Sequence, residues 1–235
     1  MTDIEYLKKY LNSDKLEEGV KKLEKGIPVQ YIVGNVDFYG SIIEVNENVL
    51  IPRFETEELV DQVIKRLKNK NNLDIVDLGT GSGCIAISLA KNLNSNVDAV
   101  DISKEALEVA KKNAINNNVN INFYLGDMLN PLNKKYDLII SNPPYIAYDE
   151  EIMDIVKNNE PHLALYADNE GLYYYEQILK NVKDYLKKDY LIAFEIGYKQ
   201  AKKIELLAHQ YLDCSVTIEK DLYGKDRYVF IKNSN

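Results

Sequence analysis

The chain has 235 residues, a formal net charge of −8 and a pI near 5.0, so the protein as a whole has no electrostatic reason to bind a polyanion. Apolar residues make up 46% and charged residues 28% of the composition, which excludes a disordered, collagen-like or coiled-coil chain. The length fits one large domain, or one domain with an appendage.

Helices followed by short strands are predicted for the N-terminal part. Residues 3–25 carry apolar side chains at helical spacing and end before Gly26 and Pro28, which predicts one or two short helices. Residues 30–51 are rich in β-branched and aromatic types, notably at 31–33 and 49–51, so we expect a hairpin or short strands there. A capped amphipathic helix should follow Pro52. We expect an N-terminal helical segment over 1–27, a β-hairpin linker region over 28–54 and the main domain over 55–235.

Beyond residue 72, apolar strands alternate with helices. The strands cover 73–78, 97–100, 121–125, 138–140 and 190–196, and the helical stretches cover 82–93, 103–116, 170–187 and 198–211. Buried parallel strands with crossover helices explain this alternation. Residues 215–218 and 228–231 flank a turn and predict a closing hairpin. We therefore expect a doubly wound α/β domain with a mostly parallel seven-stranded sheet and an antiparallel C-terminal hairpin.

A glycine-rich turn follows the first of these strands. Residues 77–84 read Asp-Leu-Gly-Thr-Gly-Ser-Gly-Cys, and glycines at this place let backbone N–H groups approach a ligand beside a helix N-terminus. Cys84 stands where the dinucleotide fingerprint has its third glycine, and no Gly-Lys-Ser/Thr follows as in a P-loop. The sequence therefore argues against NAD and ATP; a plain βα turn is the alternative interpretation.

Acidic residues end the next two strands. Asp101 ends the second strand, where a carboxylate can accept hydrogen bonds from both ribose hydroxyls of a nucleoside; the alternative is that it caps the next helix. Asp127 ends the third strand beside Met128. This pair could bind an adenine amino group and cover the ring. Together with the glycine turn, these acids predict a nucleoside site without a pyrophosphate clamp.

The most specific segment directly follows the fourth strand, where residues 141–146 read Ser-Asn-Pro-Pro-Tyr-Ile. Pro143 and Pro144 fix a rigid, extended turn and leave the Asn142 side-chain carbonyl and the Pro143 backbone carbonyl free to accept hydrogen bonds. Two such acceptors match a planar NH₂ group, and Tyr145 offers a flat aromatic face. The alternative is a turn with a purely structural role.

These residues resemble those of S-adenosylmethionine-dependent methyltransferases that act on planar nitrogens, either adenine amines or the glutamine amide. Sequences flanking them are similar to the HemK/PrmC family, which methylates the glutamine of the Gly-Gly-Gln motif in peptide chain release factors. The resemblance covers about residues 28–231 and rests on residues 28–34, 38–40, 51–57, 160–165, 194–197 and 224–227. Only about 27 residues precede it, whereas family members usually have a longer N-terminal helical domain.

The resemblance implies a Rossmann-like class I methyltransferase fold, with 55–235 as the methyltransferase domain, and methylation of class-1 release factors. S-adenosylmethionine would be the cofactor and S-adenosylhomocysteine the product. The implied catalytic residues are Asn142, Pro143 and Tyr145. The implied substrate-binding residues are Asn142, Pro143, Pro144 and Tyr145. The implied cofactor-binding residues are Gly79, Thr80, Gly81, Ser82, Gly83, Asp101, Asp127, Met128 and Asn142.

Three further residues, Arg53, Glu55 and Thr56, would lie at the mouth of the site by the same resemblance. A capping box before the helix explains Thr56 equally well. Glu195 either faces the pocket or is a buried carboxylate with satisfied hydrogen bonds.

Three further functions stay open at this point. An adenine-specific DNA or RNA methyltransferase shares the Asn-Pro-Pro-Tyr chemistry but needs a recognition domain and a basic face. A protein methyltransferase with a different target and a non-catalytic nucleoside-binding scaffold are also compatible with these motifs. Cys84 and Cys214 lack the spacing of a zinc site or disulfide framework, and the chain start is charged. We expect a cytoplasmic monomer that binds no metal, no nucleic acid and no membrane.

Overall fold

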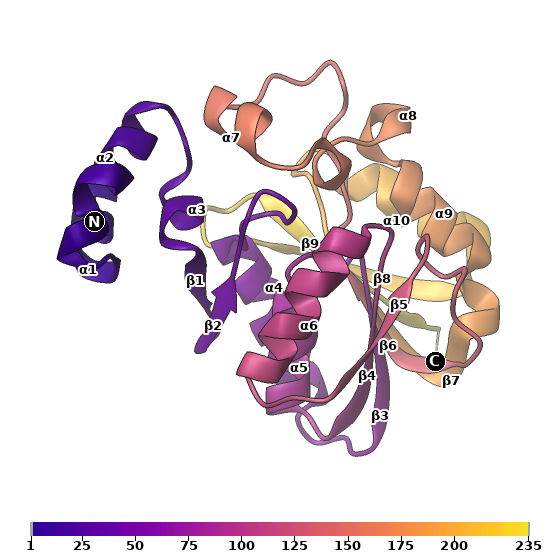
Figure 1. Cartoon of the computed structure of the whole chain (residues 1–235). Coiled ribbons are helices and arrows are strands. Elements are labelled where there is room, and N and C mark those ends of the chain that lie inside the picture. Colours follow the sequence, from indigo (N-terminus) through magenta and orange to yellow (C-terminus); the bar gives the residue numbers. More distant parts are fainter. Residues whose placement is uncertain (1, 235) are drawn as a thin grey trace.

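A seven-stranded sheet forms the centre of the protein, which a computed structural model describes for residues 2–234 (Figure 1). The strand order is β5-β4-β3-β6-β7-β9-β8. The strands are β3 (Leu73–Leu78), β4 (Ser95–Asp101), β5 (Ile121–Leu125), β6 (Tyr136–Ser141), β7 (Leu186–Glu195), β8 (Cys214–Lys220) and β9 (Asp226–Asn233). Neighbours from β5 to β7 pair in parallel, and β9 runs antiparallel to both β7 and β8. The predicted mixed sheet is confirmed.

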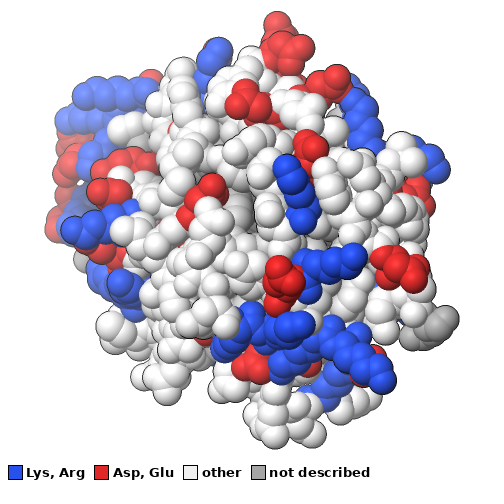
Figure 2. All heavy atoms as spheres, turned by 90° about the vertical axis from the view of Figure 1, so that its right-hand side faces the viewer, with Lys and Arg blue, Asp and Glu red and all other residues white. Residues whose placement is uncertain are grey.

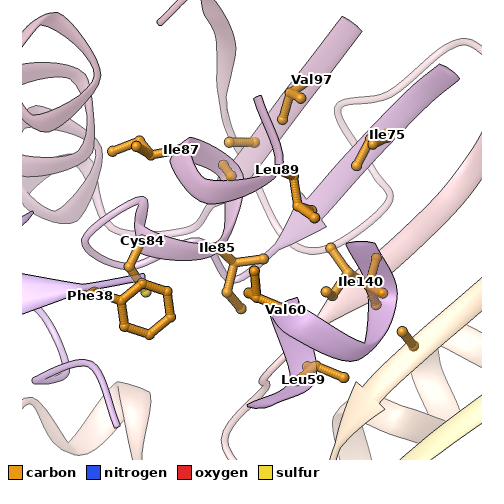
Figure 3. Packing of buried hydrophobic residues seen from close by; sticks show 14 of the residues in the cluster. Phe38, Leu59, Val60, Ile75, Cys84, Ile85, Ile87, Leu89, Val97 and Ile140 are labelled. Carbon is orange, nitrogen blue, oxygen red and sulfur yellow. The ribbon is translucent and has the colours of Figure 1, made fainter. Parts of the chain in front are cut away.

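Helices cover both faces of the sheet, because successive side chains of a strand point to opposite faces. On one face, α4 (Phe54–Leu67), α5 (Cys84–Asn92) and α6 (Lys104–Asn116) pack with Ile75 and Ile140 in one hydrophobic core (Figure 3). On the other, α9 (Tyr173–Asn181) and α10 (Ala201–Tyr211) pack with Val76 and Ile139 in a second core. Burial on both faces explains the unbroken apolar runs in the sequence.

The helix predicted over 170–187 is shorter and divided in the structure. Asn169 and Glu170 have φ values of 55° and 54°, which separate the short α8 (Asp168–Gly171) from α9, and the 3-10 turn η3 (Val182–Tyr185) follows α9. β7 begins at Leu186 rather than at residue 190. Its charged start resembles a loop in the sequence, but the Lys187 ammonium lies 2.5 Å from the Asp74 carboxylate and 2.8 Å from that of Asp137.

Two N-terminal helices, α1 (Asp3–Tyr10) and α2 (Leu16–Glu24), lie at the left of Figure 1, away from the seven-stranded sheet, and are joined by the 3-10 turn η1 (Ser13–Lys15). Leu7 of α1 is fully buried. At Gly19 of α2, an added Cβ would lie 2.7 Å from Leu11 Cδ1 and 3.4 Å from Ile32 Cγ2. The two helices therefore have a small apolar contact of their own.

The strand predicted for residues 31–33 is wrong, because they belong to helix α3 (Val29–Val33). Pro28 precedes the helix, and Gly34, with φ 85°, ends it by donating its N–H to the Gln30 carbonyl at 2.7 Å. These end signals outweigh the β propensity of the three residues.

A predicted hairpin does follow this helix, formed by β1 (Asn35–Phe38) and β2 (Ser41–Glu44). The strand expected at 49–51 is absent, because this segment pairs with no neighbour in a ladder. Val49 and Ile51 are nevertheless buried in the first hydrophobic core. The segment therefore passes along the domain and leads directly into α4.

The order in which strands are added to the sheet reverses at β3. The chain moves outward to β4 and β5 and then returns to β6 and β7 on the other side. In such sheets the ligand crevice lies at the carboxyl ends of the strands beside the reversal. The remaining elements, α7 (Asp154–Asn159) and the 3-10 turn η2 (His162–Ala164), follow β6 and lie near this end (Figure 1).

Charges of both signs are mixed on the surface. Figure 2 shows the face at the right of Figure 1, where Lys and Arg gather in the lower part of the view among Asp and Glu. Cys84 and Cys214 are both buried and free. Within residues 2–234, no helix has the length and apolar character that crossing a membrane requires.

Candidate active site

Two neighbouring cavities lie at the carboxyl ends of β3, β4 and β6. The first measures about 210 Å³ and the second about 370 Å³. Leu50, Asn142 and Ala164 line both. The two cavities therefore meet at Asn142. The sequence predicts that this residue binds both the cofactor and the substrate.

The glycine turn forms one wall of the first cavity. Gly79, Thr80, Gly81 and Ser82 line it. Gly79 and Gly81 have positive φ values of 72° and 54°, and a Cβ added to either would meet no atom within 4 Å. This wall presents bare backbone to open space, as a ligand that packs against the turn requires.

Behind this turn lies the fully buried Asp77. The Thr80 hydroxyl donates to its Oδ2 at 2.6 Å, while its Oδ1 has no hydrogen-bond partner among the described residues. Burial raises the pKa of Asp77 to about 7, although the hydrogen bond from Thr80 opposes this rise. Asp77 thus holds the glycine turn in place through its hydrogen bond with Thr80.

The third glycine of the turn, Gly83, does not line either cavity. It precedes α5 with φ 83°, and an added Cβ would lie 3.1 Å from Cβ and 3.3 Å from Cα of Ala110 in α6. Gly83 therefore occupies a helix-packing position, and its contact with a cofactor stays a prediction. A glycine at this position allows α5 and α6 to approach closely.

Asp101 lies at the end of β4 and lines the first cavity. Its Oδ2 accepts the Gly81 N–H at 2.8 Å, and its Oδ1 accepts the Ser103 N–H at 2.9 Å. Burial raises the pKa of its carboxyl, and these hydrogen bonds oppose the rise. The residue that caps α6 is Ser103, whose hydroxyl accepts the Ala106 N–H at 3.1 Å. Asp101 is thus not the helix cap, and its carboxylate keeps free lone pairs toward the cavity.

The remaining predicted cofactor residues line the same cavity. Asp127 is exposed, and Met128 is partly buried with φ 44°. Both follow β5, directly after Leu125 and Gly126. The first cavity thus has acids at the ends of two neighbouring strands and an apolar side chain beside the second acid.

The Asn-Pro-Pro-Tyr segment separates the two cavities. Pro144 lines the first cavity, and Pro143 and Tyr145 line the second. Gln200 Nε2 donates to the Tyr145 carbonyl at 2.9 Å and holds this turn in place. Burial raises the pKa of the Tyr145 hydroxyl, so this side chain is neutral.

Thr56 contacts Asn142 and links it to Glu195, an arrangement that the sequence did not show. The Asn142 Nδ2 donates to the Thr56 hydroxyl at 3.1 Å, and this hydroxyl donates to Glu195 Oε2 at 2.7 Å. The capping box proposed for Thr56 is wrong, because α4 begins after Arg53 without a side-chain cap. Thr56 lines the first cavity and Glu195 the second.

An ion pair joins the two segments that close over the cavities. The Arg53 guanidinium pairs with the buried Glu160 carboxylate, which also accepts the Ile51 N–H at 3.1 Å. Arg53 lines the second cavity, and Pro161 lines the first. Of the residues predicted at the mouth of the site, Arg53 thus lines the second cavity, whereas Glu55 lines neither.

Similarity to known proteins identifies the family of this chain. A family profile described as "Methyltransferase small domain" matches residues 58–163. The release factor glutamine methyltransferase of Lactococcus lactis is 44% identical over 221 residues, which cover 92% of this chain and 82% of that protein. The chain belongs to the release factor glutamine methyltransferase family. The predicted resemblance to HemK/PrmC proteins is thereby confirmed.

Other members of the release factor glutamine methyltransferase family agree in sequence and in fold. The Bacillus subtilis protein of that name is 42% identical over 89% of this chain and 77% of its own length. The crystal structure of the release factor-specific protein-(glutamine-N5) methyltransferase from Alicyclobacillus acidocaldarius has a TM-score of 0.52 at 27% identity, and the match covers 82% of this chain and 99% of that one. The class I methyltransferase fold is therefore established.

This family's fold implies the use of S-adenosylmethionine, and the first cavity fits that molecule. Its walls combine the bare backbone of Gly79 and Gly81 with the carboxylates of Asp101 and Asp127 and the apolar Met128. Carboxylates suit hydroxyl and amino groups, and an apolar side chain suits an adenine ring. The residues present therefore match a nucleoside that carries no phosphate.

Proposed function

We propose that this chain transfers a methyl group from S-adenosylmethionine to the side-chain amide nitrogen of the glutamine in the Gly-Gly-Gln motif of class-1 peptide chain release factors. The observation that carries the proposal is the position of Asn142 where the two cavities meet. Its Nδ2 is engaged by Thr56, so its Oδ1 is the atom left to accept a hydrogen bond from a substrate NH₂ group. The family relatives support this choice of substrate.

In this proposal the first cavity holds the cofactor. The turn from Gly79 to Ser82 would contact its amino-acid part, and Asp101 would accept hydrogen bonds from the ribose hydroxyls. Asp127 would accept from the adenine amino group, and Met128 would cover the ring. The support is that each of these residues lines the cavity.

The second cavity would receive the glutamine side chain. Asn142 Oδ1 and the Pro143 carbonyl would accept the two hydrogens of its NH₂ group, and the Tyr145 ring would lie against its flat amide. Pro143 and Tyr145 line this cavity together with Arg53. Pairing both N–H groups fixes the direction in which the nitrogen lone pair points.

An amide nitrogen is a weak nucleophile, so the protein's main contribution is to hold it in line with the methyl group. S-adenosylmethionine supplies that methyl on a sulfonium: the nitrogen–carbon bond forms as the carbon–sulfur bond breaks, and the sulfur takes the electron pair. Positive charge develops on the nitrogen during transfer, so the hydrogen bonds to Asn142 and Pro143 strengthen in the transition state. The nitrogen then loses one proton to water and becomes a neutral methylamide.

The N-terminal parts would serve mainly the partner rather than the chemistry. We assign recognition of the folded release factor to residues 1–27 and to the hairpin region 28–54, and methyl transfer to residues 55–235, acting as a monomer. The support is that α1 and α2 lie apart from the seven-stranded sheet (Figure 1), and that the residues lining the two cavities all lie at position 47 or later. Residues 47–53 of the hairpin region reach the cavities and would take part in both roles.

One incubation tests the proposal. Purified protein, methyl-labelled S-adenosylmethionine, a purified release factor and added DNA or RNA are mixed; peptide mass spectrometry locates methyl on the factor, and counting of the separated nucleic acid detects label there. Label on the Gly-Gly-Gln glutamine is expected with the wild-type protein and with the surface control Asn181→Ala, and little label with Asn142→Ala. Label only in added DNA or RNA, or on another residue of the factor, would overturn the proposal.

A further inference from the structure

Asn142 and two buried side chains from distant parts of the chain form a chain of hydrogen bonds. Asn142 Nδ2 lies 3.1 Å from Thr56 Oγ1, which lies 2.7 Å from Glu195 Oε2. Thr56 is 3% exposed and Glu195 is 1% exposed. Water therefore has little access to compete for the bond between Thr56 and Glu195. We call this the Asn142–Thr56–Glu195 relay.

The direction of these bonds follows from the donors available. An ionised carboxylate has no hydrogen to donate, so the Thr56 hydroxyl must give its single hydrogen to Glu195. Thr56 can then only accept from Asn142, which must turn its NH₂ group toward Thr56. The Asn142 Oδ1 is left without a hydrogen-bond partner among residues 2–234.

An asparagine amide has nearly the same shape when it is rotated by half a turn, so packing alone does not choose between its two orientations. In the rotated orientation Asn142 would present its NH₂ group to the NH₂ group of a substrate. Two donors would then face each other, and the transition-state hydrogen bond would be lost. A partner of fixed polarity is therefore needed behind Asn142.

We propose that Thr56 and Glu195 are positioning residues that hold the Asn142 amide with its oxygen toward the substrate nitrogen, and that this requires Glu195 to be ionised. The inference rests on the proposed function and deepens it. If Glu195 is protonated, its O–H can donate to Thr56, and Thr56 can then donate to Asn142. This reversal favours the rotated, inactive amide.

The surroundings of Glu195 allow both of its states near neutral pH. Arg227 on β9 and Arg53 before α4 favour the ionised form, whereas Glu55 on α4 opposes it. Burial is the largest influence and raises the pKa of Glu195 to about 7. The other titratable groups facing it are neutral side chains, namely Cys84, Tyr145, Tyr175 and Tyr228.

Substitution of Thr56 tests the relay directly. Thr56→Val keeps the shape and removes the hydroxyl, and Thr56→Ser keeps the hydroxyl. With release factor as substrate and saturating cofactor, we expect kcat to fall about 10- to 100-fold in Thr56→Val, the loss that corresponds to one hydrogen bond in a charged network. Thr56→Ser should retain nearly the wild-type kcat. Because Thr56 also lines the first cavity, calorimetry measures cofactor affinity in both variants, and kcat is compared at a cofactor concentration that saturates each of them.

The pH dependence tests the role of ionised Glu195. Wild-type kcat should rise as pH increases through about 7, and this rise should be absent in Glu195→Gln. The Asn142 side-chain NH₂ signal in ¹⁵N–¹H spectra, identified by its loss in Asn142→Ala, should shift over the same pH range in the wild type only. Asp77 also has a pKa raised to about 7, but it is present in both proteins and so cannot produce a difference between them.

Each outcome decides a different point. Methylation of the release factor at the wild-type rate by Thr56→Val, or an Asn142 signal that shifts equally in Glu195→Gln, would overturn the relay and leave the proposed function intact. If the wild-type protein itself leaves the glutamine unmethylated, the proposed function fails. The spectra then still show whether Glu195 sets the orientation of the Asn142 amide.

Discussion

Replacing Gly83 by alanine should destabilise the protein more than the same change at Gly81. Both glycines have positive φ, 83° and 54°, a conformation that costs other residues roughly 1–2 kcal/mol. At Gly83 the new Cβ would also lie 3.1 Å from the Ala110 Cβ, and such overpacking costs about 1–3 kcal/mol. At Gly81 the Cβ would meet no atom within 4 Å. We expect the free energy of unfolding to fall by about 2–5 kcal/mol in Gly83→Ala and about 1–2 kcal/mol in Gly81→Ala.

Urea unfolding, followed by circular dichroism, measures both losses, and calorimetry with S-adenosylhomocysteine measures binding. Affinity should follow the opposite order, because Gly81 lines the first cavity and Gly83 does not. Equal destabilisation by the two substitutions would refute the packing argument, since it would mean that α6 moves away without loss. A larger loss of affinity in Gly83→Ala than in Gly81→Ala would return Gly83 to the cofactor site.

Four other predictions concern the site and its partner. Asn142→Ala should reduce turnover by about two orders of magnitude with cofactor affinity retained; near wild-type rates in a methylation assay would make Asn142 structural. Asp101→Ala should weaken cofactor binding by about 1.5–3 kcal/mol, and unchanged calorimetric affinity would remove Asp101 from the site. Because burial raises the pKa of Asp77 from 3.8 to about 7, the folded protein holds a proton that the unfolded chain releases, so the free energy of unfolding should fall as pH rises between these values. Asp77→Asn should reduce this slope in urea titrations and leave the part that Glu195 contributes, because burial raises the pKa of that carboxyl to about 7 as well; an unchanged slope would assign it to other groups. Deleting residues 1–25 should raise the KM for release factor and leave cofactor binding unchanged; an unaltered KM would show that these helices play no part in recognition.

The sequence predicted the sheet well because its signals there are local. Strands buried on both faces appear as apolar runs, and glycine and proline mark the turns between them. The prediction failed where local preference and tertiary context disagree. Residues 31–33 have strand propensity but lie between Pro28 and Gly34, which enclose a single short helix. Lys187 looks like a loop residue until Asp74 and Asp137 are brought beside it.

For the site, the sequence indicated the residues that line the two cavities better than those that support them. The glycine turn and the Asn-Pro-Pro-Tyr segment are contiguous motifs with a chemical meaning. Thr56 and Asn142 are 86 positions apart, and Thr56 and Glu195 are 139 positions apart, so no spacing pattern reveals that they meet. Gly83 shows the converse, because a glycine at a helix-packing position is indistinguishable in sequence from one that lines a cavity.

The order of strands in the sheet has a consequence for synthesis of the protein. β9 follows every other strand in the chain, yet it lies between β7 and β8. Until residues 226–233 have left the ribosome, β7 therefore has an open edge, a state that favours mispairing and aggregation. Arg227, which faces Glu195, arrives with the same strand. A nascent chain thus completes the surroundings of its buried carboxylate only in the last step of sheet formation, and incomplete chains are the ones most in need of chaperones.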